Sequence, residues 1–347
     1  MMRPKATMAD VAREAGVSPS TASRVLHSSG YASAENRQRV LLAAEKVGYR
    51  PNMQARGLRT QRSYTLGISL DSATSNPYFT NVAHAVRTQA AAAGFSLLTV
   101  DHEFDSAVER DGLRHFLDHS VEAVIVCHPF DAGNFAFVKD AGVPIIQIER
   151  DVIVGAHCVA IDPEPGFERA LEHLLQLNHR RIGYVGGHRS TQASPQRGKS
   201  VEDRRVHAFR TFGGAMGLDP AQCPVFVIPY DFDISGGTLS GYQFAQQLLR
   251  EKDCPTALVV GSDVLAAGIL QAAHDFGISV PQDLSIIGYD DSIAKLLSPP
   301  LTTIAHPYRE IASGVLNILE MTAAGPSRPL RRVVRSEFKL GRSTQAI

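Results

Sequence analysis

The chain has 347 residues, of which 44% are hydrophobic and 20% charged, and its formal net charge is zero. This composition is typical of a globular protein and excludes a disordered chain, and the length predicts two or three domains. No apolar run approaches the roughly 20 residues that cross a bilayer, and the start of the chain lacks the apolar segment of a signal peptide, so we expect a cytoplasmic protein with no membrane contact.

Charge is distributed unevenly along the chain. Residues 1–62 contain eleven Lys or Arg and four Asp or Glu residues, a net charge of +7, which leaves −7 for the rest of the chain. This asymmetry favours a polyanion-binding module joined to an ordinary globular body, with a solvated basic tail as the plainer alternative. The four cysteines are widely spaced without a Cys-x-x-Cys pattern, so we expect buried free thiols and neither a zinc ribbon nor a disulfide framework. We also expect no other metal site and no cofactor.

The amino-terminal segment predicts a pair of short helices separated by a sharp break. The first spans residues 8–15, with Thr7 as its N-cap, and ends at Gly16. The second begins at the pair Ser18 and Pro19, because a serine hydroxyl caps new helix amides and proline is favoured at the first helical position. Its helical spacing separates a packing face from a polar face, which consists of Ser20, Ser23, Arg24 and His27.

A third helix is expected from about Ser33 to Gly48. Its predicted buried stripe consists of Val40, Leu41, Ala44 and Val47. Three small helices with a tight turn between the first two predict a helix-turn-helix domain, whose second helix enters the DNA major groove.

Residues 51–62 predict a hinge. Asn52 is an N-cap candidate for a short helix over residues 53–59, which is too short to be stable alone in water and so should need DNA or a partner. A basic helix that presents Leu58 suits minor-groove insertion, and a flexible linker is the alternative.

Beyond residue 62, apolar runs alternate with amphipathic helical runs. The expected strands are YTLGISL, FSLLTVD, VEAVIVCH, PIIQIE, CVAID, RIGYVGG, VFVIPY, TALVVG and LSIIGYD. This alternation predicts parallel sheets built from βαβ units, and the number of strands favours two α/β lobes over one sheet. Such sheets bind ligands beyond the carboxyl ends of their strands, so polar residues at strand ends are candidate contacts.

Several segments together resemble the LacI/GalR family of transcriptional regulators. They are TMADVAREAGVSPSTASRVLHSSGYASAENRQRVLLAAEKVGYRPNMQARGLRTQRSYTLGI, and later NPYF, LNHRRIGYVGG, SDVLAAGIL, VPQDLSIIGYDD and PPLTTIAHP. The resemblance implies an all-α helix-turn-helix DNA-binding domain over residues 1–50, a hinge helix and linker over 51–62, and an α/β effector and dimerisation domain over 63–347. It implies that this last domain consists of two doubly wound parallel-sheet lobes, periplasmic-binding-protein-like, with an effector between them.

The resemblance also implies residues that contact DNA. Pro19, Ser20 and Arg24 match positions that read bases, and Leu58 matches the leucine that enters the minor groove. The complete set, which includes phosphate contacts and a neighbouring hinge position, is Thr7, Ser18, Pro19, Ser20, Thr21, Ser23, Arg24, Asn52, Leu58 and Arg59.

A second implied set would contact the effector. Phe79 matches the aromatic residue that stacks on the effector, Arg205 an arginine that hydrogen-bonds it, and Asp290 an aspartate that takes its hydroxyls or amines. The complete set is Asn76, Phe79, Glu149, Arg150, Arg205, Ser262, Asp263 and Asp290.

The chain departs from the family pattern at several effector positions. Glu149 stands where relatives often have Asp, and Ser262 where they commonly have Asn. The chain has no tryptophan, so Phe79, Tyr230 or Phe232 must provide the apolar surface that sugar-binding relatives often take from a tryptophan.

These features predict a DNA-binding regulator, which we expect to be a repressor. Its expected partners are a pseudo-palindromic double-stranded operator and a small-molecule effector. We expect a carbohydrate as this effector, because sugars are common effectors in the family. A homodimer is expected, because one helix-turn-helix reads only a few base pairs and the carboxyl terminus lacks a leucine heptad that would join dimers. An enzyme is the competing class, but the sequence has no G-x-S-x-G, G-x-G-x-x-G, P-loop or H-E-x-x-H motif. A separate sugar-binding receptor would not need the helix-turn-helix. The sequence leaves open the effector, the operator, the regulated genes, and the choice between induction and corepression.

Overall fold

The computed structural model describes residues 6–26, 30–49, 62–72, 76–189, 200–230, 236–323, 325 and 328–347. The chain divides into two compact units, Met1–Ser63 and Tyr64–Ile347. Each unit has hydrophobic cores of its own.

The first unit contains three helices, α1 (Met8–Ala15), α2 (Pro19–Leu26) and α3 (Ala34–Val47). They enclose a small core of buried aliphatic side chains: Val11, Ala12, Ala15, Ala22, Val25, Val40, Ala43 and Ala44. The prediction that Leu41 is buried was wrong, because α3 turns Ala43 toward the core and leaves Leu41 53% exposed.

The second unit contains two six-stranded sheets. The first sheet has the order β11-β5-β4-β3-β1-β2, with strands β1 (Thr65–Leu70), β2 (Ser96–Asp101), β3 (Val124–Cys127), β4 (Ile145–Ile148), β5 (His157–Asp162) and β11 (Arg331–Arg335). The second has the order β12-β10-β9-β8-β6-β7, with strands β6 (Ile182–Arg189), β7 (Val225–Tyr230), β8 (Ala257–Val260), β9 (Ser285–Asp290), β10 (Thr302–Ala305) and β12 (Glu337–Lys339).

Neighbouring strands are parallel, except that β12 runs antiparallel to β10. The two lobes of parallel sheet confirm the predicted fold class. The sequence pattern did not identify β10, β11 or β12, because these strands are short and two of them lie at sheet edges, where exposed charged residues replace an apolar run.

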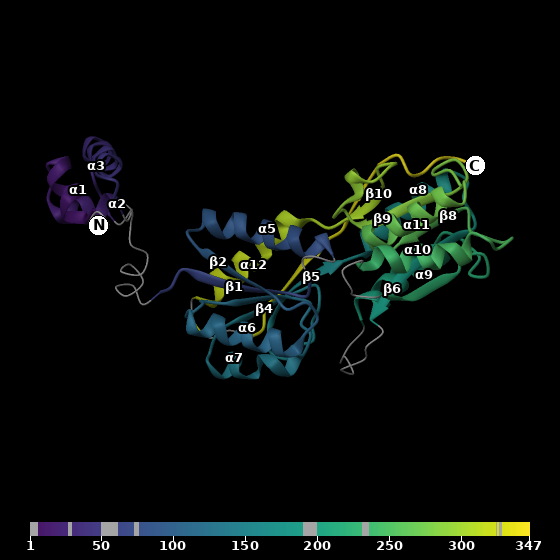
Figure 1. Ribbon diagram of the computed structural model, residues 1–347, viewed down its shortest axis with the longest axis horizontal. Helices are drawn as coiled ribbons and strands as arrows, with labels where there is room; N and C mark the ends of the chain where they lie inside the picture. Colours follow the sequence, from purple (N-terminus) through teal and green to yellow (C-terminus); the bar gives the residue numbers. More distant parts are fainter. Residues whose placement is uncertain are drawn as a thin grey trace. The chain divides into compact units, whose positions relative to one another are not determined.

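Helices cover both faces of each sheet (Figure 1). In the first lobe, α5 (Pro77–Ala92) and α12 (Tyr308–Thr322) lie on one face, and α6 (Ser106–Asp118), η1 (Ala132–Phe135) and α7 (Ala136–Asp140) on the other. The helices of the second lobe are α8 (Glu164–Gln176), α9 (Val201–Ala215), α10 (Gly236–Leu248), α11 (Asp263–Asp275) and the short η2 (Ala294–Leu296). Among the described residues, no helix has both the length and the apolarity that a membrane span requires.

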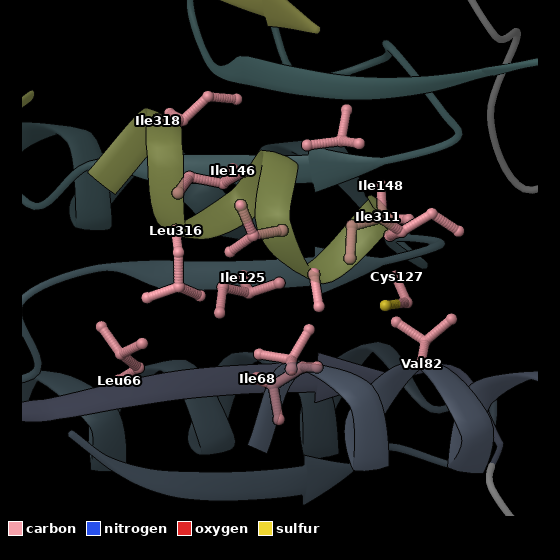
Figure 2. Close-up of a cluster of buried hydrophobic side chains, with 14 of the residues drawn as sticks. Leu66, Ile68, Val82, Ile125, Cys127, Ile146, Ile148, Ile311, Leu316 and Ile318 are labelled. Atoms are coloured by element: carbon pink, nitrogen blue, oxygen red, sulfur yellow. The ribbon is translucent and has the colours of Figure 1, made fainter. Parts of the chain in front are cut away.

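Figure 2 shows the core between the first sheet and helices α5 and α12. Leu66 and Ile68 of β1, Ile125 and Cys127 of β3, and side chains of α12 interdigitate there. The adjacent strands β1 and β3 are therefore fixed to each other both by backbone hydrogen bonds and by a closely packed, shared core.

The chain passes between the lobes three times: between β5 and α8, between β10 and α12, and between β11 and β12. These crossings place the carboxyl ends of strands from both sheets in the same part of the unit, as shown by the hydrogen bond from Arg205 of α9 to Glu149, which follows β4. This is the region in which parallel α/β sheets bind ligands.

Candidate functional site

The turn between α1 and α2 is held by local hydrogen bonds. Thr7 and Asp10 form a reciprocal capping box at the start of α1, and Gly16 ends that helix in the left-handed conformation, with φ of 62°. Arg39 of α3 donates from Nη2 to the carbonyl oxygen of Ala15 at 2.6 Å. The angle between α1 and α2 is therefore fixed from outside the turn as well as within it.

The start of α2 contains a compact group of hydroxyls. The backbone amide of Thr21 donates to Ser18 Oγ at 3.1 Å, which makes Ser18 a helix cap. Ser18 Oγ also lies 2.8 Å from the hydroxyls of Ser20 and of Thr21. These bonds orient short donors and acceptors at the helix end that reads base edges in helix-turn-helix proteins.

The predicted DNA contacts of α2 lie on its accessible side. Pro19, Ser20 and Arg24 are exposed, while Ala22 and Val25 are buried against the other helices. Ser23 and Thr21 are partly buried, and Thr7 is exposed but uses its hydroxyl in the capping box. Asn52, Leu58, Arg59 and the hinge predicted over residues 51–62 lie outside the described residues, apart from residue 62.

A buried ion pair joins the two lobes of the second unit. Glu149 follows β4 and has a left-handed backbone, with φ of 65°. Arg205, in the second turn of α9, donates from Nη2 to Glu149 Oε1 at 2.7 Å and from Nη1 to the carbonyl oxygen of Gly261 at 3.0 Å. Arg204 donates to the carbonyl oxygen of Glu149 at 2.8 Å, so two successive arginines of α9 hold the strand end of the first lobe.

The charges of this pair stabilise each other despite burial. Burial alone would raise the pKa of Glu149, but Arg205, with His306 and Arg204, lowers that pKa to about 2. Burial disfavours the guanidinium of Arg205, yet Tyr289 and the carboxylates of Glu149 and Glu202 raise its pKa well above the usual value. Both groups are thus charged over the physiological pH range.

Aromatic rings extend from this ion pair into both lobes. The guanidinium carbon of Arg205 lies 4.2 Å from the ring centroid of Tyr289, and the rings of Tyr289 and His306 are 4.9 Å apart. The ring centroids of His306 and Tyr78 are 5.3 Å apart, and those of Tyr78 and Phe79 are 5.2 Å apart. Phe79 and Arg205, which were predicted as effector contacts, therefore belong to one continuous cluster.

This cluster contains polar atoms that lack partners. Among the described residues, the Tyr78 hydroxyl and both ring nitrogens of His306 are buried without a hydrogen bond. Burial lowers the pKa of His306 to about 4, so its ring is neutral at physiological pH. Buried polar atoms without partners are costly, and water or a bound polar molecule usually satisfies them.

Asp290 lies at the carboxyl end of β9, beside the same cluster. Its backbone has a φ of 88°, its Oδ1 accepts from the amide of Ser292 at 2.8 Å, and its carbonyl accepts from the Tyr308 hydroxyl at 2.9 Å. Burial and the nearby carboxyl of Asp263 raise the pKa of Asp290 well above its usual range. A neutral carboxyl can donate as well as accept, which suits recognition of a hydroxyl.

The other predicted effector contacts have structural partners. Asn76 caps α5 by accepting from the amide of Tyr78, and Ser262 caps α11 by accepting from that of Leu265. Asp263 is fully buried and accepts from Thr303 Oγ1 and from the amides of Ile293 and Ala294. Arg150 is partly buried beside Glu149. Asn76, Ser262 and Asp263 thus hold strand and helix ends around the cluster.

The predicted apolar surface is only partly described. Tyr230 is buried in the core beneath α10 and α11, and Phe232 lies outside the described residues. The sequence reasoning missed His128, which follows β3 and contacts both Phe79 and Asp71, and it missed Tyr78, Tyr289 and His306. His128 ends the predicted apolar run VEAVIVCH, so the strand-end rule contained a signal for it that was overlooked. His306 follows β10, which the sequence pattern did not identify. Across the described residues, no group of three or more His, Cys, Asp or Glu side chains is arranged to hold a metal ion.

The chain matches two protein families. Residues 7–52 match "Bacterial regulatory proteins, lacI family", and residues 171–344 match "Periplasmic binding protein-like domain". The HTH-type transcriptional regulator DegA of Bacillus subtilis (strain 168) is 31% identical over 318 residues, which cover 89% of each chain. The ribose operon repressor of Haemophilus influenzae is 29% identical and covers 95% of each chain.

Solved structures show the same architecture. The lac repressor dimer bound to operator and the anti-inducer ONPF superposes with a TM-score of 0.72 at 25% identity, covering 99% of this chain and 100% of that chain. A LacI family regulator from Enterococcus faecium with bound ribose superposes with a TM-score of 0.66 at 22% identity, covering 82% of this chain and 99% of that chain. The protein belongs to the LacI family of transcriptional regulators, and it is a regulator and not an enzyme.

Proposed function

We propose that the protein is a repressor that binds a pseudo-palindromic DNA operator as a homodimer, and that a small molecule between its two lobes controls operator affinity. We further propose that this effector is a sugar or sugar derivative. The domains are those expected from the sequence: DNA-binding over residues 1–50, hinge over 51–62, and effector binding and dimerisation over 63–347. Operator binding in a bacterium implies a cytoplasmic location.

The observation that carries the DNA-binding part is the accessible face of α2. Ser20, in the first turn of the capped helix α2, and Arg24, in its last turn, are exposed on the side opposite the buried Ala22 and Val25. Arginine donates bidentately to guanine in the major groove, and serine hydroxyls reach bases or phosphates. The segment that contains this helix, residues 1–62, has a net charge of +7, as contact with phosphates requires.

The effector part rests on the cluster that both lobes build. Glu149 and Phe79 of the first lobe and Arg205, Tyr289 and Asp290 of the second combine an apolar surface with donors and acceptors, as carbohydrate recognition requires. Solved family members hold ribose in one case and lactose in another, which supports a sugar. A ligand that contacts both lobes has a different affinity for each arrangement of the lobes, and that difference is what controls operator affinity.

Selection of fragmented genomic DNA from the source organism by the full-length protein, near physiological salt, tests the proposal. We expect an enriched pseudo-palindrome whose affinity falls steeply as salt rises. Arg24→Ala should cost about 1–3 kcal/mol of binding free energy and relax preference at one operator position. Arg13→Ala is the matched control, because Arg13 is an exposed arginine of α1 that pairs with Asp10. An unenriched library, or an unchanged preference in Arg24→Ala, contradicts the assignment.

A further inference from the structure

The second unit begins with a residue in a restricted backbone conformation. Tyr64 has a φ of 51°, in the left-handed region that tyrosine rarely adopts. Its amide donates to Glu122 Oε1 at 2.8 Å, and its carbonyl accepts from the amide of Ser96 at 2.8 Å. Its ring lies 6.0 Å from that of Phe95. The left-handed conformation of Tyr64 persists because neighbouring residues contact its amide, its carbonyl and its side chain.

Glu122 is itself fixed to the strand that follows Tyr64. The amide of Glu122 donates to the carbonyl oxygen of Thr65 at 2.8 Å, so its backbone and its side chain hold consecutive residues. Glu122 directly precedes Ala123 and β3, and β3 pairs with β1. The carboxylate therefore joins the first residue of the unit to the paired strands β1 and β3 of the first lobe.

The same strand pair ends beside the effector cluster. Asp71 follows β1 and His128 follows β3, and these two side chains contact each other. The ring of His128 lies 6.1 Å from that of Phe79. Six residues of β1 span roughly 20 Å, and the shared core of β1 and β3 makes this path stiff (Figure 2).

We propose that Glu122 and Tyr64 form a linker anchor, which fixes the direction in which the chain leaves the effector domain toward the DNA-binding domain. Glu122 is a positioning residue in this role. The inference rests on the proposed function, because a fixed exit direction matters only if two tethered DNA-binding domains must reach one operator.

The physical effect of the anchor is on the second binding event. After one DNA-binding domain of a dimer has bound its half-site, the other binds at an effective concentration set by the stiffness and direction of its tether. A freely rotating exit spreads that domain over more positions and lowers the effective concentration. Loss of the anchor should therefore weaken binding to a full operator and leave the affinity for a single half-site unchanged.

The test compares Glu122→Ala with Glu122→Gln in the full-length chain. Glutamine retains an oxygen that accepts from the Tyr64 amide, whereas alanine does not. The probes are fluorescent duplexes that carry the pseudo-palindrome recovered from genomic DNA by the wild-type protein, or only one of its half-sites. We expect Glu122→Ala to bind the full site about tenfold more weakly and the half-site within twofold of wild type, with Glu122→Gln like wild type on both.

A second pair of variants keeps the inference testable if Glu122→Ala does not fold. Tyr64→Gly and Tyr64→Asn both lose the aromatic ring, but asparagine favours the left-handed conformation while glycine leaves the backbone free. We expect Tyr64→Gly to bind the full site several-fold more weakly than Tyr64→Asn does, with equal binding to the half-site.

The possible failures are distinguishable. Wild-type affinity of Glu122→Ala for the full site, or equal losses on both duplexes, overturns the anchor alone. If Glu122→Ala does not fold, equal full-site binding by the two Tyr64 variants overturns it. If the wild-type protein recovers no pseudo-palindrome, the proposed function fails and the anchor fails with it.

Discussion

Asp290 and Asp263 show how burial at strand ends shifts proton binding. Burial raises the pKa of Asp263 to about 7, and burial together with Asp263 raises that of Asp290 well above its usual value of 3.8. Between about pH 4 and pH 7 the folded chain therefore binds more protons at these groups than the unfolded chain does, and stability falls as pH rises. The destabilisation is complete above the folded-state pKa values and absent below the unfolded-state values.

Asp290→Asn should remove the part of this destabilisation that comes from Asp290. Asparagine is neutral at every pH and its Oδ1 can still accept from the Ser292 amide, so we expect Asp290→Asn to be more stable than wild type at pH 8, with a gain that disappears near pH 4. Thermal unfolding of the full chain from pH 4 to pH 8 measures this difference in stability between Asp290→Asn and wild type. Asp253→Asn, at an exposed position, is the control and should follow the wild-type profile. Parallel profiles for wild type and Asp290→Asn would rule out the raised pKa.

At the residue scale, the sequence predicted which residues lie at strand ends better than it predicted which residues they contact. Glu149 and Asp290 could be identified from the sequence because each ends an apolar run, and the strand-end rule depends only on local pattern. The bond between Glu149 and Arg205 spans 56 residues and depends on how two lobes meet, which no local pattern contains. The buried ring of His306 depends on the same tertiary arrangement.

At the element scale, caps fix helix ends and tertiary packing fixes helix faces. Thr7, Gly16, Ser33 and Gly48 lie where the sequence predicted, because capping uses residues adjacent to the helix. The face of α3 was predicted less well, since the choice between Leu41 and Ala43 depends on the approach of α1 and α2. The edge strand β11 was missed because three of its five residues are arginines.

Arg39→Ala tests whether α3 sets the geometry of the turn between α1 and α2. The guanidinium of Arg39 donates to the carbonyl oxygens of Ala15 and Gly16, at the carboxyl end of α1 where positive charge is favourable. Its loss should destabilise the three-helix unit by about 1–2 kcal/mol, so amide exchange in α1 and α2 of the full chain should accelerate about tenfold. Arg37→Ala, which removes an exposed arginine from the same helix, should exchange like wild type. Equal rates in the two variants would show that the turn is independent of α3.

At the scale of the whole molecule, control by an effector requires reciprocity. If a sugar bound between the lobes changes operator affinity by some factor, the operator must change sugar affinity by the same factor, which is about 5–150-fold in typical systems. Under the proposed function, the buried pair of Glu149 and Arg205 is a contact through which a ligand would distinguish arrangements of the lobes, because its two members belong to different lobes.

Ribose and lactose, which solved family members hold, are the first probes for this coupling. We expect at least one of them to change binding of the full-length protein to its selected duplex, measured by fluorescence anisotropy. Calorimetry should then show that the duplex changes the affinity of the protein for that sugar by the same factor by which the sugar changes the affinity for the duplex. Arg205→Ala removes a group that links the lobes and should abolish the coupling, whereas Arg169→Ala, at an exposed pair with Glu172 on α8, should preserve it. Unequal factors would contradict a two-state linkage, and a response retained in Arg205→Ala would show that the effector acts elsewhere in the molecule.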